Sequence, residues 1–228
     1  RQGSVAFGLH VVSALALVDT RHEYYRVFDV YVPIALAAFV VFAGAIVWAA
    51  LRYRGRSPAA ASRRHESNRL EAGYALILAC IVAFLLYVTF SAEHQVDVVS
   101  AHERPSLTID VTASQWEWTF RYPAYGITQR SGFVGSQPLV VPVDTAVRFN
   151  LLSADVIHSF WIPQLRFKRD LLPGETEPVT LDFDQVGTFG GQCGEFCGLR
   201  HAEMVFTVTV VSGQRFQVWA RSGGRRPE

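Results

Sequence analysis

The stretch VYVPIALAAFVVFAGAIVWAAL, residues 30–51, contains no charged side chain in 22 positions. At about 1.5 Å per residue a helix of this length spans roughly 33 Å, which is enough to cross a bilayer. A second uncharged run of sufficient length, AGYALILACIVAFLLYVTFSA, occupies residues 72–92. The alternative for each run is a buried core helix, but core helices are rarely uncharged on every face. The two runs therefore predict a transmembrane hairpin over residues 27–92.

The connecting loop, residues 52–71, carries six arginines and only two glutamates. The positive-inside rule places such a loop in the cytoplasm, so both ends of the chain are expected on the outer side. The apolar part of residues 1–26 is too short to span a bilayer. Since the chain begins at Arg1, this segment is interpreted as already processed after a signal peptide, or as a short helix on the outer face.

From residue 93 to residue 228 the pattern changes to short runs rich in β-branched and aromatic residues, separated by Gly and Pro. Such runs are typical of strands, and their spacing predicts an antiparallel sandwich or barrel. A closing helix is expected at residues 214–220. The expected strands are residues 107–113, 115–122, 146–152, 179–183 and 204–211.

The composition excludes several classes of protein. Half of the residues are hydrophobic, which excludes disorder, collagen and a coiled coil. The net charge of +1 gives no reason to expect nucleic-acid binding. The three cysteines are too few for a disulfide framework, and Cys80 reads as a small apolar residue in the middle of a span. The chain also lacks a C-x-x-C-H haem attachment motif, a P-loop and a dinucleotide fingerprint, so no haem is expected in it.

One motif of the second half carries chemistry, GGQCGEFCGLRHAEM at residues 190–204. It contains Cys193, Cys197, His201 and Met204, and His158 lies 35 positions before the first of these cysteines. Thiolate, imidazole and thioether are soft ligands, which favour copper over magnesium, calcium or manganese.

Several sites compete for this set of residues. A structural zinc site seldom includes Met. A disulfide between Cys193 and Cys197 would leave His201 and Met204 unexplained. A mononuclear blue-copper site uses one Cys, two His and a weak Met, and this chain has one thiolate more. Two bridging thiolates with two capping histidines would hold two coppers, and this is the favoured interpretation. Such a set is saturated with protein ligands, so it suits electron transfer rather than catalysis at an open metal position.

The two spans, the β domain, QWEW at residues 115–118, DVIHSFWIP and the cysteine motif together resemble subunit II of haem–copper cytochrome c oxidases. The resemblance covers nearly all of the chain after residue 25. It implies a mixed membrane and β architecture, a transmembrane hairpin followed by a cupredoxin-like Greek-key β-barrel with a dinuclear CuA centre. Cys193 and Cys197 would then bridge two copper ions. The remaining implied ligands are His158 and His201, each on one copper, Met204 as a weak ligand, and the backbone carbonyl of Glu195.

The same resemblance assigns roles to four more groups. The side chain of Glu195 would bind a magnesium or manganese ion at the border with subunit I. Trp116 matches the exposed aromatic that receives electrons from cytochrome c. Apart from the resemblance, strand alternation places Trp118 on the same face as Trp116, and it is expected to be structural. Glu71 matches the cytoplasmic mouth of a proton channel into subunit I. Asp155 matches a carboxylate near the docking surface of the donor.

The resemblance further implies a membrane-bound electron-accepting subunit of a proton-pumping oxidase, in a bacterial plasma membrane with the CuA domain on the outer side. Its partners would be subunit I, other oxidase subunits and cytochrome c. Residues 92–220 hold 14 acidic and 9 basic residues, net −5, which would steer a basic cytochrome. TFRYPAYG at residues 119–126 holds no acid, however, so a tethered or atypical cytochrome is an alternative donor.

Other functions remain open from the sequence alone. A CuA subunit of a nitric oxide reductase would carry the same ligands. A quinol oxidase subunit would share the architecture, but those relatives lose the copper ligands. A membrane-anchored copper chaperone would favour exposed, exchangeable ligands, and copper-dependent absorption of the purified chain would distinguish it.

Overall fold

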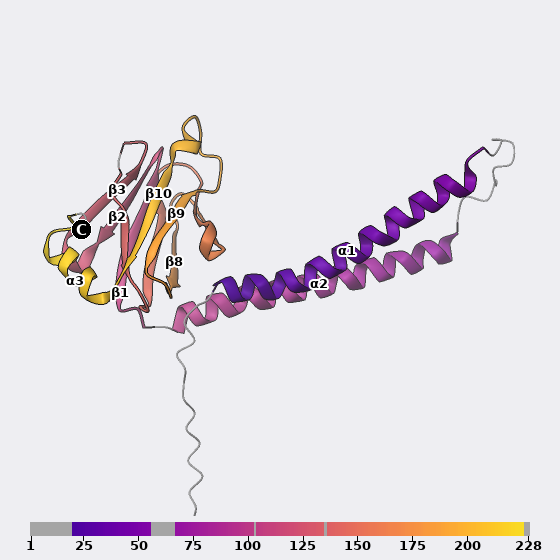
Figure 1. The fold of residues 1–228 in the computed structure, drawn as a ribbon, viewed down its shortest axis with the longest axis horizontal. Helices are drawn as coiled ribbons and strands as arrows, with labels where there is room; N and C mark the ends of the chain where they lie inside the picture. Colours follow the sequence, from indigo (N-terminus) through magenta and orange to yellow (C-terminus); the bar gives the residue numbers. More distant parts are fainter. Residues whose placement is uncertain (1–19, 56–66, 103, 135, 226–228) are drawn as a thin grey trace, which may run out of the picture. The chain divides into compact units, whose positions relative to one another are not determined.

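The computed structural model describes residues 20–55, 67–102, 104–134 and 136–225 (Figure 1). The chain divides into two compact units. One unit is helical and covers Thr20–Val96, and the other contains the described residues from Asp97 onward. The second unit is called the β domain below, and each unit is considered by itself.

The helical unit consists of α1, Thr20–Tyr53, and most of α2, Asn68–His102. Both helices are long and apolar enough to cross a membrane, with mean hydropathies of 2.6 and 2.5 in their most apolar windows. Hardly any of these apolar side chains is buried. A helix with apolar side chains exposed on all sides suits lipid rather than water. The two predicted spans are confirmed as helices of this kind.

The helices differ from the predicted spans at their ends. Residues 20–26, expected in an outer-face segment, form the first two turns of α1, and the rest of that segment lies outside the described residues. Pro33, near the start of the predicted span, therefore lies inside α1. Its missing N–H leaves the carbonyl of Asp29 without its usual helical partner. Both helices also extend into the predicted loop 52–71, of which residues 56–66 lie outside the description.

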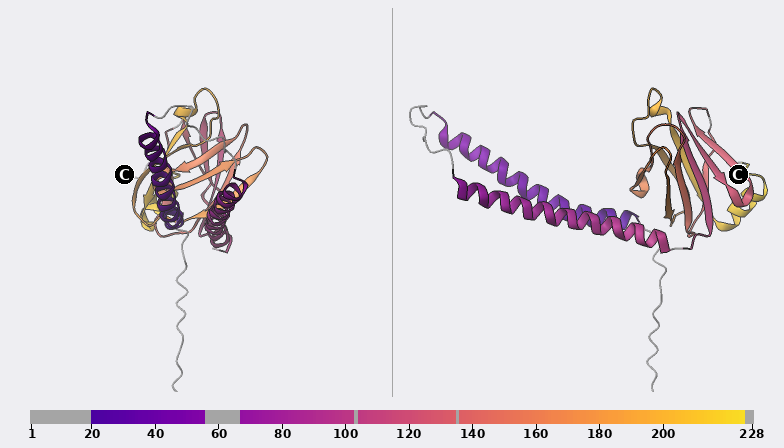
Figure 2. Two further views of the ribbon diagram at one scale, coloured as in Figure 1. Left: turned by 90° about the vertical axis from the view of Figure 1, so that its right-hand side faces the viewer. Right: turned by 180° about the vertical axis from the view of Figure 1, so that it is seen from behind.

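Polar contacts join the two helices. The Tyr31 hydroxyl lies 2.8 Å from Thr89 Oγ1 and donates to the carbonyl of Leu85 at 3.2 Å. Nearer the start of α1, Arg26 donates to Ser91 Oγ at 3.4 Å. These contacts pair the beginning of α1 with the second half of α2, as expected for an antiparallel hairpin (Figures 1 and 2).

The β domain is built from two five-stranded sheets, in the orders β3-β2-β1-β5-β8 and β4-β10-β9-β6-β7. The strands of the first sheet are β1 Leu107–Ser114, β2 Glu117–Tyr122, β3 Ile127–Gly132, β5 Val147–Ser153 and β8 Thr176–Leu181. Those of the second sheet are β4 Leu139–Pro142, β6 His158–Ile162, β7 Phe167–Leu171, β9 Gly187–Cys193 and β10 Val205–Val211.

The sheets are mixed rather than purely antiparallel, which corrects the sequence expectation. β1 pairs with β5 in parallel, and β10 pairs with β4 in parallel, while the other pairings are antiparallel. Alternation along a strand shows which face is buried but not the direction of its neighbour. The pattern also missed five strands, β3, β4, β6, β7 and β9, most of which are short or contain polar residues and glycines.

The core lies between the two sheets and is rich in aromatic rings. β1 and β5 alternate buried and half-buried residues along their whole length, as one-sided strands do. The Tyr122 hydroxyl accepts from the N–H of Val140 at 2.8 Å and donates to its carbonyl, so it links the sheets. Helix α3, Gly213–Arg221, buries Phe216 and Trp219 against this core, close to the predicted closing helix.

The strand directions give the domain two ends. We call the end where β1, β5 and β9 finish and β6 and β10 begin the ligand end. The far end is the one where β1, β5 and β9 begin and β8 and β10 finish. The loop between β9 and β10, residues 194–203, is called the ligand loop, and it protrudes at the top of the domain in Figure 1.

Candidate metal centre

Four of the sequence-predicted ligands come together because strands start or finish at the ligand end. His158 is the first residue of β6, Cys193 is the last residue of β9, and Met204 directly precedes β10. Cys197 lies in the ligand loop between them. The N–H of Cys193 donates to the carbonyl of Met204 at 3.0 Å, which closes the base of this loop. All four side chains are buried.

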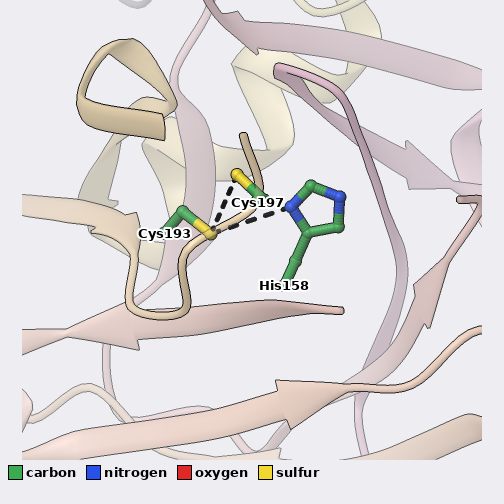
Figure 3. A group of neighbouring side chains, drawn as sticks. All are labelled: His158, Cys193 and Cys197. Atoms are coloured by element: carbon green, nitrogen blue, oxygen red, sulfur yellow. Dashed lines mark hydrogen bonds between the residues drawn. The ribbon is translucent and has the colours of Figure 1, made fainter. Parts of the chain in front are cut away.

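The ligand atoms form a continuous cluster, of which Figure 3 shows His158, Cys193 and Cys197. Cys193 Sγ lies 3.7 Å from Nδ1 of His158 and 3.8 Å from Cys197 Sγ. Cys197 Sγ in turn lies 3.6 Å from Nδ1 of His201 and 3.8 Å from Sδ of Met204. The carbonyl oxygen of Glu195 lies 3.2 Å from Cys193 Sγ. Each thiol therefore has one histidine and one weaker donor beside it, a two-sided arrangement around a central sulfur pair.

The two sulfurs are separate thiols, since a disulfide would require a bond of about 2.05 Å. Burial acts to raise the pKa of Cys193, but hydrogen bonds to His158 and to backbone groups outweigh it and lower the pKa. Burial and the neighbouring Cys193 raise the pKa of Cys197. Two buried anions this close repel each other, so only cations between them would let both ionise. The cluster thus fits a pair of soft, positively charged metal ions.

Asp155 fixes the orientation of His158. Its Oδ1 lies 2.8 Å from Nε2 of His158 and accepts from the N–H of Val156, while Oδ2 accepts from the N–H of Gln115 at 2.7 Å. Burial acts to raise the pKa of Asp155, but these hydrogen bonds lower it below its usual range. Burial acts to lower the pKa of His158, but contacts with Cys193 and Asp155 raise it. The carboxylate thereby leaves Nδ1 of the imidazole directed at Cys193, the usual arrangement behind a metal-binding histidine.

Trp118 supports the other side of the cluster. It is completely buried, and its indole N–H donates to the carbonyl of Met204 at 3.3 Å. Its ring also meets the His158 ring edge-on, with centroids 6.3 Å apart. The side chain expected to be merely structural therefore contacts two candidate ligands.

Trp116 is half-buried rather than fully exposed, and its indole lies over the ligand loop. A Cβ at Gly198, the residue after Cys197, would lie 3.3 Å from this indole and 3.0 Å from Gln115 Nε2. Gly198 also has a φ of +118°, a conformation that favours glycine. Gln115 Nε2 donates to the carbonyl of Cys197 at 2.7 Å. The QWEW segment is thus attached directly to the residues around Cys197.

Two other predicted site residues lie apart from the sulfur cluster. The Glu195 carboxylate is ion-paired with the chain's single lysine, Lys168, whose ammonium is also 3.4 Å from Asp170. Glu71 is exposed in the first turn of α2, where its N–H donates to the carbonyl of Ser67 at 2.9 Å.

Comparison with known proteins identifies the relatives of this chain. A family model described as "Cytochrome C oxidase subunit II, periplasmic domain" matches residues 107–211. The "Probable cytochrome c oxidase subunit 2" of Streptomyces coelicolor is 31% identical over 223 residues, covering 80% of this chain and 69% of that protein. The "Cytochrome c oxidase subunit 2" of Schizosaccharomyces pombe is 32% identical over 196 residues, covering 77% of this chain and 78% of that protein. The chain belongs to the cytochrome c oxidase subunit II family.

A solved structure extends the comparison to the fold. The crystal structure of the periplasmic domain of subunit II of cytochrome oxidase from Bradyrhizobium japonicum matches with a TM-score of 0.51 and 30% identity. The match covers 55% of this chain and 99% of that domain. The predicted fold, two apolar helices followed by a cupredoxin-like β domain, is confirmed for this chain. Family and helices together make it a membrane protein with an outer domain.

Sequence reasoning missed three contributors to the candidate site: Gln115, Trp118 and Lys168. Gln115 and Trp118 stand in the quoted QWEW segment, but nothing in the segment shows that it reaches a loop some 80 positions later. Lys168 gave one faint signal, since it is the only lysine of the chain. The pairing of Asp155 with His158 had a stronger signal, because the two are three residues apart at a strand entrance.

Proposed function

We propose that this chain accepts electrons from a cytochrome at a dinuclear copper centre, CuA, and passes them to the oxygen-reducing haem–copper site in subunit I of a cytochrome c oxidase. The observation that carries the proposal is the buried cluster of soft donor atoms around the two thiols. The oxidase would lie in a bacterial plasma membrane with the β domain on the outer side. The names of the relatives favour an oxidase over the nitric oxide reductase alternative.

His158, Cys193, Cys197, His201, Met204 and the carbonyl of Glu195 would hold the copper ions. When bound, the dinuclear copper supplies a centre that gains and loses one electron with little change in its bonds. The residues of the chain keep that change small. Buried ligands on strand ends cannot move far, the Asp155 carboxylate fixes one imidazole, and packing excludes water from the sulfur pair.

Trp116 would be the point at which electrons enter. Its indole lies against the backbone of Gly198, one residue from Cys197, so an electron could cross from the surface to the sulfur pair through contacting atoms. Glu195, next to the centre, would bind magnesium or manganese jointly with subunit I. To bind such an ion, the Glu195 carboxylate would have to release the Lys168 ammonium or contact both cations at once.

Glu71 would receive protons at the cytoplasmic side of the assembled, proton-pumping complex. Replacing it by Ala should lower oxygen consumption per haem without changing copper content, and Glu71→Asp should restore part of the loss. If Glu71 only caps α2, assembly falls while turnover per haem stays normal.

The central experiment loads the full chain with copper in detergent and measures metal content and the EPR spectrum of the oxidised form. An unpaired electron shared equally by two copper nuclei gives a hyperfine pattern with more lines than an electron confined to one. We expect the shared pattern and two coppers per chain. A one-copper pattern, or zinc bound in preference to copper, would refute the proposal.

A further inference from the structure

The surface beside Trp116 has an apolar composition. Phe133 donates its N–H to the carbonyl of Trp116 at 3.0 Å, and Val134, the next residue, is 81% exposed. Leu199, next to Gly198 in the ligand loop, is 89% exposed. The Arg200 guanidinium lies 3.8 Å from the centre of the Phe133 ring, which joins the two segments. We call Trp116, Phe133, Val134, Leu199 and Arg200 the uptake face. Exposed apolar groups gathered in this way mark an interaction surface.

The carboxylates of the strands and the loop that carry the uptake face are paired with cations. β1, β2, β3 and the ligand loop are fully described, and they carry four carboxylates, each in an ion pair with a basic side chain. The four pairs are Asp110–Arg121, Glu117–Arg130, Glu195–Lys168 and Glu203–Arg200. Asp155, on the neighbouring β5–β6 loop, already accepts hydrogen bonds with both oxygens. No unpaired carboxylate of these three strands and this loop is left to attract a basic partner.

In two of these pairs the cation is more exposed than the carboxylate, whereas Glu203 is 52% exposed against 38% for Arg200. The Arg121 side chain is 64% exposed against 24% for Asp110, and Arg130 is 63% exposed against 19% for Glu117. A partner approaching β2 and β3 therefore meets guanidinium groups, with the carboxylates beneath them. A ring of lysines on the partner would be repelled at close range, whereas carboxylates would be attracted.

Other carboxylates of the domain lie away from the uptake face. Asp144, Asp182 and Asp184 sit at the far end, where the N–H of Asp144 donates to the carbonyl of Phe183 at 2.9 Å. Glu175 is at the ligand end but precedes β8, at the opposite edge of the sheet from β3. The net charge of the domain therefore does not describe the surface around Trp116.

We propose that the uptake face binds an electron-donor domain whose docking surface has an apolar centre and an acidic rim, and not a lysine-ringed soluble cytochrome c. The inference rests on the proposed function and specifies its partner. Apolar contact over Trp116 would hold the donor in position, and the guanidinium groups of β2 and β3 would set its orientation.

The first test addresses the apolar centre. Native membranes containing the oxidase are reduced, an oxygen pulse is given, and the reoxidation rate of the membrane's own donor haem is followed. We expect Val134→Asn/Leu199→Asn to slow reoxidation about tenfold. Oxygen consumption driven by the small reductant TMPD, which needs no docked protein, should stay within about twofold. The matched control is Val186→Asn/Val218→Asn, which changes two exposed valines away from the uptake face and should alter neither rate.

The second test addresses the charged rim, with a lysine-rich soluble cytochrome c as the probe. For the wild-type oxidase we expect slow electron uptake whose rate stays flat or rises as salt is added, because salt screens repulsion. Arg130→Glu should raise the low-salt rate at least about tenfold and make it fall with salt. Arg221→Glu on α3 makes the same charge change at a distance and should have little effect.

Three results would overturn the inference. The first is fast electron uptake by the wild type from the lysine-rich probe, at a rate that falls steeply with salt. The second is unchanged donor reoxidation in the Val134/Leu199 variant. The third is loss of this chain from the complex purified from that variant. The last result would assign the face to a contact between subunits. Copper content and EPR spectrum are measured in every variant. Absence of copper in the wild type is a failure of the proposed function, whereas normal copper with any of the three results overturns the inference alone.

Discussion

The ligand end and the far end of the β domain are formed by loops that join the same strands, yet their carboxylates lie in opposite kinds of surroundings. At the ligand end, Glu117 and Glu203 are paired with arginines and Asp155 holds His158, and the donor atoms of the candidate metal centre are sulfur and nitrogen. At the far end, three aspartates stand close together, and Oδ1 of Asp182 is buried without a hydrogen-bond partner among the described residues. The comparison teaches that carboxylates support the candidate metal centre at one end and stand close together without such a role at the other.

This difference has a measurable electrostatic side. Hydrogen bonds lower the pKa of Asp155 at the ligand end despite its burial. Burial, with a smaller contribution from Asp144 and Asp184, raises the pKa of Asp182 at the far end. The ionised form of Asp155, which orients a candidate ligand, is therefore stabilised. The ionised form of Asp182, which has no such role, is destabilised.

The largest effect is expected from the sulfur pair itself. Cys197→Ser removes a bridging thiolate in the proposed site, so copper content should fall to about half or less and the shared hyperfine pattern should disappear. Cys80→Ser, in α2, is the matched control and should keep both copper and spectrum. Metal analysis and EPR of the full chain check this prediction. A retained two-copper spectrum in the Cys197 variant would contradict the ligand assignment.

A smaller loss is expected at Asp155. Asp155→Asn weakens the contact that orients His158, so copper affinity should fall roughly 10–100-fold, measured by competition with a chelator. Asp144→Asn at the far end should leave the affinity unchanged. If the Asp155 variant keeps its copper affinity but reacts more slowly with the donor, the residue belongs to the docking surface instead.

Trp118 distinguishes support of the metal centre from support of the core. Trp118→Phe removes the indole N–H that donates to the Met204 carbonyl, and it should lower the free energy of unfolding by about 1–2 kcal/mol. It should also shift the visible absorption of bound copper. Trp219→Phe, which alters a buried tryptophan of α3, is expected to cost similar stability with no spectral shift. Identical spectra in both variants would show that Trp118 supports only the core and not the metal centre.

The smallest effect is expected at the far end. Because the pKa of Asp182 is higher in the folded protein than the ordinary value of 3.8, folding favours the protonated form. The stability of the wild type should therefore rise as the pH falls from neutral through the folded-state pKa. Asp182→Asn should raise Tm by roughly 1–3 °C at pH 7, and this gain should vanish near pH 4. Thermal unfolding at both pH values measures it, and a lower Tm at pH 7 would contradict the prediction.

Much of the fold was accessible from short-range patterns. The uncharged runs fixed the two helices because every turn of each run lacks charge. β1 and β5 were recognisable because they alternate on a one-sided sheet. β9 was not, since its GTFGGQC sequence has no hydrophobic alternation and is held by pairing with β10 and β6. The start of α1 at Thr20 was missed because polar residues beyond a span continue the helix at little cost.

By itself the sequence determined which atoms this protein offers: two spans without charge, and a Cys-x3-Cys-x3-His-x2-Met run with one distant histidine. Ligand chemistry depends on residue types and on their spacing over short distances along the chain, and both can be taken directly from the sequence. Only the tertiary structure decided that Trp118 supports Met204, that Asp155 is turned toward His158, and that Glu117, next to Trp116, is paired with Arg130 of a neighbouring strand. The reason is physical, because hydrogen bonds and ion pairs act over a few ångströms, and strand pairing sets those distances between residues far apart in the chain.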